Sequence, residues 1–321
     1  MKLASAKLIL LNTVNKENMN TLDGALIDLN TLPDEMLIYV ASFLHDNPSR
    51  CAFARVCCRF HGVAHDVFDQ EPVFWHACRS GYTEIVKQLL DDSRVDPTAS
   101  NNCAITCSSV AGHAEVVKLL LDDVRVDPTA FSNYAIQMSS ARGYINVVRL
   151  LLADGRADPT AEDNWAIRFS SWNGHLDVVR LLADERADPA ADDNFAIRSS
   201  SVAGHSEVVK LLLDDPRVDP TAWDNHAIRC SSMYGHADVV KLLLDDPRVD
   251  PTAKDNHAIR ISSRNGHTDV VKLLLDDARV DPTAVDNWAI QISNQYGHTD
   301  VVRLLLADGR AYPTERYHRP I

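Results

Sequence analysis

The sequence predicts an all-α fold in which short helical repeats stack into a solenoid. The main observation is a fixed period, because the pattern Asn-x-Ala-Ile recurs seven times between residues 102 and 298, at steps of 31, 31, 30, 31, 31 and 31 residues. Each unit is too short to bury its own apolar face, so neighbouring units must supply the other half of the core. Such stacks mostly present an extended surface to a partner, and we therefore expect binding rather than catalysis. The repeated asparagines are Asn102, Asn133, Asn164, Asn194, Asn225, Asn256 and Asn287.

Composition narrows the possible partners and the compartment. The net charge of −13 argues against sequence-independent binding of nucleic acid, which needs a basic face. Seven cysteines without a paired spacing fit free thiols in a reducing compartment better than a disulfide framework. The N-terminal apolar run Leu8–Leu11 is too short for a signal peptide, and no stretch approaches the length of a membrane span. We expect a soluble intracellular protein in the cytoplasm, with the nucleus as an alternative.

In chain order, an N-terminal extension over residues 1–29 precedes a helical module over residues 30–75 that does not share the repeat. Pro33, Asp34 and Glu35 suit the first turn of a helix, where a proline and acidic residues are both favourable. Two further apolar stretches follow, one through Val56 and one that ends at Phe74-Trp75. The pattern therefore predicts two helical stretches followed by a third apolar segment.

This module resembles an F-box on the residues Leu32-Pro33-Asp34-Glu35, Phe43-Leu44, Val56-Cys57-Cys58-Arg59-Phe60 and Phe74-Trp75. One departure is Phe60, which stands where the family usually has tryptophan. The resemblance implies docking on the Skp-type adaptor of a cullin-RING ubiquitin ligase, with the rest of the chain selecting the substrate. The alternative is that these helices only cap the first repeat. The implied adaptor-binding residues are Leu32, Pro33, Leu37, Phe43, Leu44 and Val56.

Each repeat is predicted to hold two helices and an extended loop, as residues 255–285 illustrate. Asn256 is expected to cap the first helix by accepting a hydrogen bond from a first-turn amide. The small pair Ser262-Ser263 allows the next layer to approach closely, and Gly266 marks a sharp turn with a positive φ. The second helix is expected from about Thr268 to Asp276. An acid and a base three residues apart mark its exposed edge, and the Asp-Asp pair at its end is expected to be solvated.

The Gly-His turn, the Val-Val-x-Leu-Leu-Leu run and the helix–turn–helix–loop order resemble ankyrin repeats over residues 73–313, in eight copies. The chain departs from that family in two ways. The Thr-Pro-Leu-His signature is replaced by x-Ala-Ile-Arg or x-Ala-Ile-Gln, and the period is about two residues shorter than the usual 33. The shorter period predicts reduced β-hairpin fingers. An F-box ahead of such repeats resembles proteins abundant in amoebae and their giant DNA viruses; a tail over residues 314–321 ends the chain.

Positions that vary between repeats indicate where a target protein binds. Several carry aromatic side chains that the scaffold does not prescribe, and such residues are typical of binding hot spots. We predict that the target binds the concave face of the middle repeats, where these aromatic residues should lie near one another. Trp172 and Trp223 are expected to be exposed, whereas both burial and exposure are open for Trp165. The predicted partner-binding residues are Trp165, Phe169, Trp172, Phe195, Trp223 and Tyr234.

Catalytic, metal and cofactor sites are not expected. Six histidines follow the turn glycines, but packed helices lie about 8–10 Å apart, so a ladder of this kind cannot converge on one ion and should be structural. Cys103 and Cys107 lack further ligands and are expected to be small core residues. Aspartates that recur with the repeat look like loop residues, since a catalytic group is normally singular. The six histidines are His113, His175, His205, His236, His267 and His298.

Two predictions concern the layout of the repeats. Val73-Phe74 takes the Ala-Ile position of a first repeat, while Phe74-Trp75 closes the F-box pattern, so both modules should form one rigid body. The fourth unit reads Leu181-Leu182-Ala183 and lacks one residue before Arg186. We expect a shortened last turn of its second helix, stacked layers on both sides, and the fastest hydrogen exchange among the inner repeats.

Overall fold

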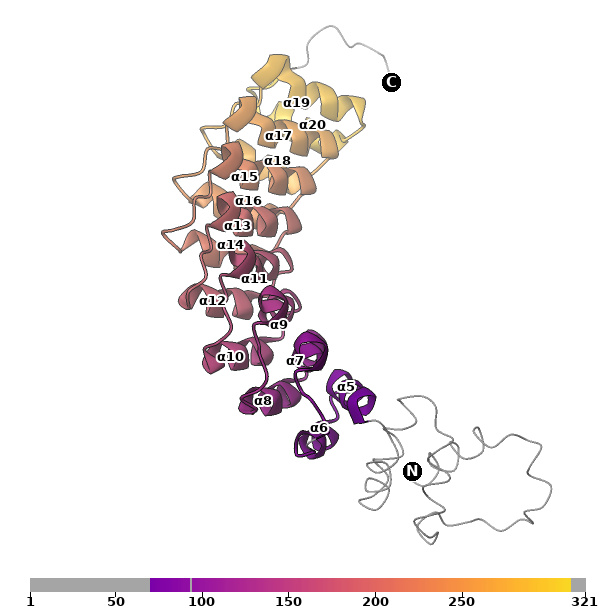
Figure 1. The fold of residues 1–321 in the computed structure, drawn as a ribbon. Helices are drawn as coiled ribbons and strands as arrows, with labels where there is room; N and C mark the ends of the chain where they lie inside the picture. Colours follow the sequence, from indigo (N-terminus) through magenta and orange to yellow (C-terminus); the bar gives the residue numbers. More distant parts are fainter. Residues whose placement is uncertain (1–69, 93, 313–321) are drawn as a thin grey trace, which may run out of the picture. The chain divides into compact units, whose positions relative to one another are not determined.

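The computed structural model describes residues 70–92 and 94–312, which form sixteen α-helices and no β-strand (Figure 1). The predicted all-α repeat architecture is therefore confirmed over this part of the chain. All six predicted adaptor-binding residues, from Leu32 to Val56, lie outside the described residues, as does most of the 30–75 module. Whether that module and the repeats form one rigid body stays a prediction.

The chain divides into two compact units. Unit 1 comprises the residues up to Ala135 together with Leu150–Ala157, and unit 2 comprises Ile136–Arg149 together with the residues from Asp158 onward. Unit 1 contains α5 (Gln70–Ser80), α6 (Thr83–Leu90), α7 (Ala99–Ala111) and α8 (Ala114–Asp122). Helices α9 (Ala130–Ala141) and α10 (Ile145–Asp154) contribute to both units. Unit 2 contains α11 (Ala161–Trp172), α12 (Leu176–Asp184), α13 (Ala191–Ala203), α14 (Ser206–Leu213), α15 (Ala222–Tyr234), α16 (Ala237–Asp245), α17 (Ala253–Asn265), α18 (Thr268–Asp276), α19 (Ala284–Gln295) and α20 (Thr299–Asp308).

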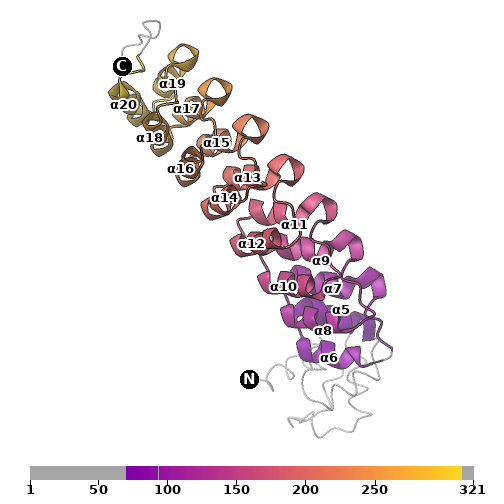
Figure 2. The same ribbon diagram turned by 90° about the vertical axis from the view of Figure 1, so that its left-hand side faces the viewer.

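Within unit 2 the helices form two layers (Figures 1 and 2). The first helices of successive repeats, α11, α13, α15, α17 and α19, pack on one another, and the second helices, α12, α14, α16, α18 and α20, pack beside them. In unit 1, α5 packs against α7 and α6 against α8 in the same way. Val73 and Phe74 are buried in α5, as Ala104 and Ile105 of the next repeat are in α7.

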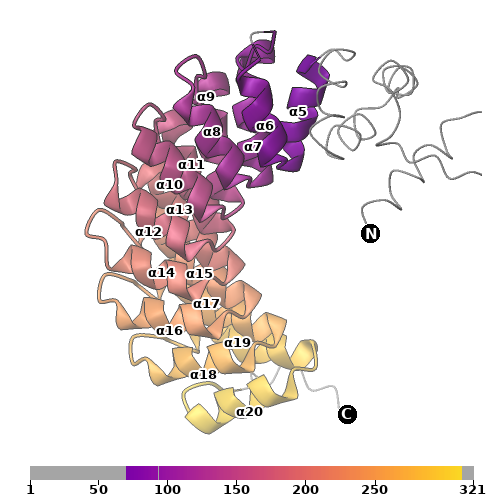
Figure 3. The same cartoon turned by 90° about the horizontal axis from the view of Figure 1, so that it is seen from below.

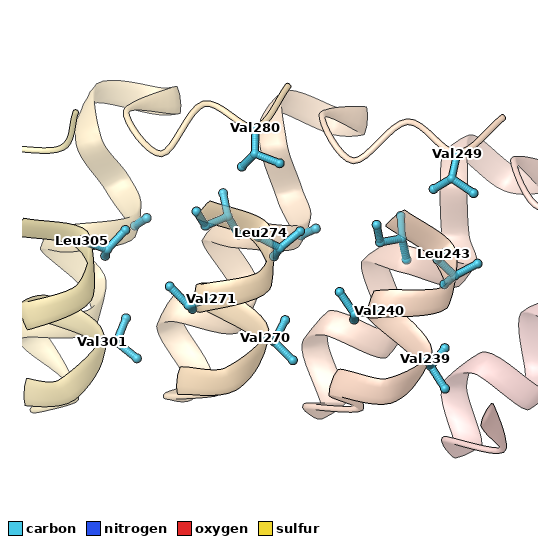
Figure 4. Close-up of a cluster of buried hydrophobic side chains, with 14 of the residues drawn as sticks. Val239, Val240, Leu243, Val249, Val270, Val271, Leu274, Val280, Val301 and Leu305 are labelled. Atoms are coloured by element: carbon cyan, nitrogen blue, oxygen red, sulfur yellow. The ribbon is translucent and has the colours of Figure 1, made fainter. Parts of the chain in front are cut away.

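The second helices form the centre of the hydrophobic core. In α18, Val270, Val271 and Leu274 are buried and belong to one cluster with residues of α16 and α20. Figure 4 shows Val270 and Val271 on opposite sides of the helix, so α18 contributes to the interfaces with both neighbours. Burial of each such side chain stabilises the fold by roughly 1.5–3 kcal/mol. This is why a single repeat cannot fold alone.

Small serines let the first helices approach one another closely, as predicted. Ser262 and Ser263 are both fully buried in α17. The Ser262 hydroxyl donates to the backbone oxygen of Ile259, 3.2 Å away. A larger side chain at either position would separate the layers.

The predicted helix cap at Asn256 is wrong. Lys254, Asp255 and Asn256 have φ values of 55°, 56° and 56° and form a left-handed turn before the helix proper. The Asn256 side chain reaches the next loop instead, where Oδ1 accepts a hydrogen bond from the backbone amide of Asp281 at 2.8 Å. Asparagine recurs here because it tolerates the left-handed region and also ties one loop to the next.

The fourth unit differs from the prediction. Helix α12 has nine residues, the same length as α16 and α18, so its last turn is not shortened. The missing residue comes from the following loop, where Glu185 takes a ψ of −130°. The layers remain stacked, since α11 packs on α13 and α12 on α14. The expected fast hydrogen exchange of this unit stays a prediction.

The second aspartate of each Asp-Asp pair is not solvated, in contrast to the prediction. Asp246 is bound by Arg248 at 2.6 Å, and its side chain is 11% exposed. The same arginine donates from Nη1 to the backbone oxygen of Val218 at 2.9 Å and from Nη2 to that of Leu213 at 3.0 Å. This Asp–Arg clamp therefore joins its repeat to the previous one, and the same contact with the previous repeat is made by Arg156, Arg217, Arg279 and Arg310. The sequence also predicts acid–base pairs three residues apart on the second helices. Of these, Asp300 and Arg303 in α20 form an ion pair, with Oδ1 and Nη1 3.2 Å apart.

Candidate protein-binding surface

Four of the six predicted partner-binding residues lie together on the first helices of unit 2. The rings of Trp165 and Phe169 stack on α11 with centroids 4.1 Å apart. Phe195, from α13, lies 5.7 Å from Phe169 and 6.2 Å from Trp172, so side chains of two successive repeats are in contact. We call these four residues the aromatic cluster.

Trp223 extends the aromatic cluster through an arginine. The guanidinium carbon of Arg198 lies 5.8 Å from the ring centroid of Phe195 and 3.8 Å from that of Trp223. The indole Nε1 of Trp223 also lies 3.4 Å from Oδ2 of Asp193. A fifth predicted residue thus joins the same surface.

Burial in this setting lowers the pKa of Arg198. The residue is 7% exposed, and desolvation lowers the pKa of the guanidinium. The nearby carboxylates of Asp192 and Asp193 act in the opposite direction. Its Nε and Nη2 donate to the backbone oxygens of Asp193 and Asp192 at 2.9 and 3.0 Å.

The arginine that follows Ala-Ile holds the turn that displays Trp223. Trp223, Asp224 and Asn225 have φ values of 56°, 56° and 58°. Arg229 donates to the backbone oxygens of Trp223 and Asp224, at 2.9 Å each, and so satisfies the carbonyls of this left-handed turn. The x-Ala-Ile-Arg pattern therefore has a local structural role that the sequence analysis missed. The signal was the recurrence of arginine in one column, at Arg168, Arg198, Arg229 and Arg260.

Tyr234 does not join the aromatic cluster, although the sequence analysis expected it near Trp172 and Trp223. It lies at the end of α15, directly before the turn glycine, and its ring is 6.3 Å from that of His236. Helix α13 lies between α11 and α15, and packed helices are about 8–10 Å apart, so α15 is two such spacings from α11. Tyr234 is 52% exposed, so it can still contact a large partner.

Exposure distinguishes the residues of this surface. Trp172 and Trp223 are 45% and 57% exposed, which confirms the expectation for both. Trp165, Phe169 and Phe195 are each partly buried, so neither of the two alternatives for Trp165 holds in its simple form. The surface therefore consists of three partly buried aromatic side chains and two exposed tryptophans.

The six histidines have the structural role predicted for them. In each, Nε2 forms a hydrogen bond of 2.9–3.0 Å with a backbone oxygen of the previous repeat. His267, for example, bonds to the backbone oxygen of Met233 at 2.9 Å. Its ring also lies over Gly235, where a Cβ would come within 2.6 Å of Nδ1. Successive turns are thus locked together by a glycine and a histidine.

Cys103 and Cys107 lie one helical turn apart on α7, with their sulfur atoms separated by 3.2 Å. Both are partly buried, whereas the sequence analysis expected them in the core. Desolvation raises the pKa of Cys107 to about 11, so the thiol is protonated at neutral pH. Within residues 70–92 and 94–312, no three histidine, cysteine or carboxylate side chains are arranged to hold a metal ion. None of the helices described is both long and apolar enough to span a bilayer.

The comparisons with known proteins agree with this architecture. A family model of ankyrin repeats in three copies matches residues 39–132, 173–255 and 228–316, which is over half of the chain. The first of these matches begins inside the 30–75 module. No match was found among curated proteins.

Solved structures of ankyrin repeat proteins are similar to this chain. The crystal structure of the human ASB11 ankyrin repeat domain is 15% identical, with a TM-score of 0.50 over 58% of this chain and 95% of that one. The ankyrin repeat protein EF0377 is 21% identical, with a TM-score of 0.45 over 53% of this chain and 96% of that one. At such identities the likeness concerns the fold alone.

Proposed function

Because the chain belongs to the ankyrin-repeat family, we propose that it is a non-catalytic interaction protein that binds a target protein on the first-helix side of unit 2. Ankyrin repeats imply a protein-interaction scaffold. The target would contact the aromatic cluster together with Trp223. The chain is proposed to work in the cytoplasm.

The observation that carries this proposal is the exposure of two tryptophans at positions where the fold needs none. The place of Trp223 is taken by Glu162, Asp192 and Lys254 in other repeats, so stacking does not require an indole there. An exposed Trp side chain leaves a large apolar area in water, and its burial by a partner is favourable. Tryptophan is also among the residues that contribute most to binding free energy.

A finer proposal assigns residues 30–75 to an adaptor. We propose that they form an F-box that docks on a Skp-type adaptor, which would make the chain the substrate receptor of a cullin-RING ubiquitin ligase. The support is the joint occurrence of Leu32-Pro33-Asp34-Glu35 and Val56-Cys57-Cys58-Arg59-Phe60 in one short segment. The target-binding surface would then bring the substrate to the ligase.

A second candidate is a plain scaffold whose N-terminal helices only cap the stack. Two observations favour it. The ankyrin-repeat match begins at residue 39, inside the proposed F-box. Phe74, which closes the F-box pattern, is fully buried in α5, a helix that packs against α7. The two candidates share the target-binding surface and differ in the adaptor.

Co-purification of the full chain with a Skp-type adaptor separates these candidates. We expect the adaptor to be retained by the natural chain and lost from a Leu32→Ala/Pro33→Ala variant. A Trp172→Ala/Trp223→Ala variant is the matched control and should retain the adaptor. If the natural chain retains no adaptor, the F-box proposal fails and the plain scaffold remains.

Target binding is tested with the same tryptophan variant. Removal of both indoles should weaken capture of the target at least about 30-fold, because each hot-spot residue contributes on the order of 2 kcal/mol. Tyr296→Ala is the control, since Tyr296 is 54% exposed at the end of α19 and is outside the aromatic cluster. Equal capture by the tryptophan variant and the control would contradict the proposal.

A further inference from the structure

We infer that the target segment bound at this surface is basic, with arginine or lysine side chains beside apolar ones. The inference rests on the proposed function and specifies the chemistry of the partner. Three observations support it: the sign of the exposed charges around the aromatic cluster, the engagement of the local arginines, and the position of the carboxylates relative to Trp223.

Every exposed charged side chain on α11 and α13 is a carboxylate. Glu162 and Asp163 precede the first of these helices proper, and Asp192 and Asp193 precede the second. The basic residues of the same helices are largely covered, since the Arg168 side chain is 15% exposed and Arg198 is 7% exposed. A partner that approaches the aromatic cluster therefore meets negative charge.

Neither arginine is available to bind an acidic partner. Arg168 forms ion pairs with Asp192 at 3.0 Å and with Asp163 at 3.4 Å. Its guanidinium carbon also lies 5.0 Å from the ring centroid of Phe195. Arg198 donates to backbone oxygens and lies between Phe195 and Trp223, as described above. Both arginines are thus engaged by carboxylates, backbone oxygens and aromatic rings of the protein itself. An acidic segment of a partner would therefore be repelled by the exposed carboxylates.

One carboxylate lies at the edge of an indole, and another remains exposed on the same surface. Oδ2 of Asp193 is 3.4 Å from the indole nitrogen of Trp223, and the Asp163 side chain remains 65% exposed. A lysine or arginine of the partner can lay its aliphatic stem along an indole and place its cationic group beside these carboxylates. The net charge of −13 favours the same class of partner through long-range attraction.

A selection of displayed random peptides on the full chain tests this inference. We expect the selected peptides to be enriched in arginine and lysine and to bind more weakly as the salt concentration rises. Their affinity should fall about three- to tenfold in an Asp163→Asn/Asp193→Asn variant. Asparagine tolerates the positive φ of both positions, so this variant should fold normally.

The control is Asp238→Asn/Asp269→Asn, which makes the same change of net charge on the second helices α16 and α18, away from the aromatic cluster. It should leave peptide affinity within about twofold of the natural chain. Neutral or acidic peptides that need Trp172 and Trp223 would overturn this inference and leave the proposed function standing. Peptides that bind all variants equally, or failure to select any peptide, would overturn both.

Discussion

The contact between a turn glycine and the histidine of the next repeat gives a stringent test of how the repeats are joined. Gly235 has a φ of 79°, and a Cβ there would lie 2.6 Å from Nδ1 and 2.9 Å from Cε1 of His267. The ring cannot move freely, because Nε2 is held by the backbone oxygen of Met233 at 2.9 Å. Gly235→Ala must therefore strain the turn and displace the ring.

The size of the effect follows from these contacts. Alanine in the left-handed region costs about 1–2 kcal/mol, of which roughly 0.4–1 kcal/mol is offset because the unfolded chain is stiffer. Overpacking adds roughly 1–3 kcal/mol, and loss of the histidine hydrogen bond adds about 1 kcal/mol. We expect Gly235→Ala to lower the free energy of unfolding by about 3 kcal/mol.

The matched control is Gly297→Ala. Gly297 has a φ of 77°, yet a Cβ added there would have no atom of the described residues within 4 Å, so only the backbone cost of about 1 kcal/mol applies. Guanidinium unfolding followed by circular dichroism measures both variants. Adding His267→Ala to Gly235→Ala should recover most of the overpacking cost. Equal destabilisation at Gly235 and Gly297, or no recovery in the double variant, would refute the proposed glycine–histidine lock.

Three further predictions test other contacts between and within the repeats. Asn225→Ala removes the acceptor for the Asp250 amide, 2.8 Å away, and leaves alanine at a positive φ, so thermal unfolding should show a loss of about 2 kcal/mol. Ser232→Ala should be neutral or stabilising by about 1 kcal/mol, because its buried hydroxyl has no partner among the described residues, whereas Ser231→Ala loses a hydrogen bond and should be destabilising. The hydrogen bond that Asp246 accepts from Arg248 lowers the pKa of Asp246 below its usual 3.8. The clamp therefore stabilises the fold fully above pH 3.8, and this stabilisation is lost as the pH falls through the lowered pKa. In an acid titration, Asp246→Asn should lose stability less steeply than the natural chain.

Much of the fold could be predicted because the repeat pattern carries it. The Val-Val-x-Leu-Leu-Leu run predicts a second helix from about Thr268 to Asp276, the bounds that the structure shows, and Gly266 has the expected positive φ. The left-handed turn at Lys254–Asn256 could not be predicted, because three successive residues with positive φ are unusual outside glycine. An asparagine before a helix looks the same in sequence whether it caps that helix or binds a distant loop.

The candidate surface could be predicted in its residue types but not in its arrangement. Exposure of Trp172 and Trp223 followed from their variable positions. Which aromatic rings meet depends on the offset between layers, and this offset brings Phe195 to Trp172 but leaves Tyr234 outside the aromatic cluster. The role of Arg198 depends on the carbonyl oxygens of the left-handed turn, so it could not be recognised before that turn was known.

Hydrogen–deuterium exchange of the full chain with and without a selected peptide tests the proposed surface most directly. Figure 3 shows α11, α13 and α15 as neighbours in one layer, apart from α12, α14 and α16. We predict slower exchange on binding in α11, α13 and the turn that carries Trp223, with little change in the second helices. Protection confined to the second helices, or spread evenly over both layers, would contradict the assignment of the aromatic cluster as the binding surface.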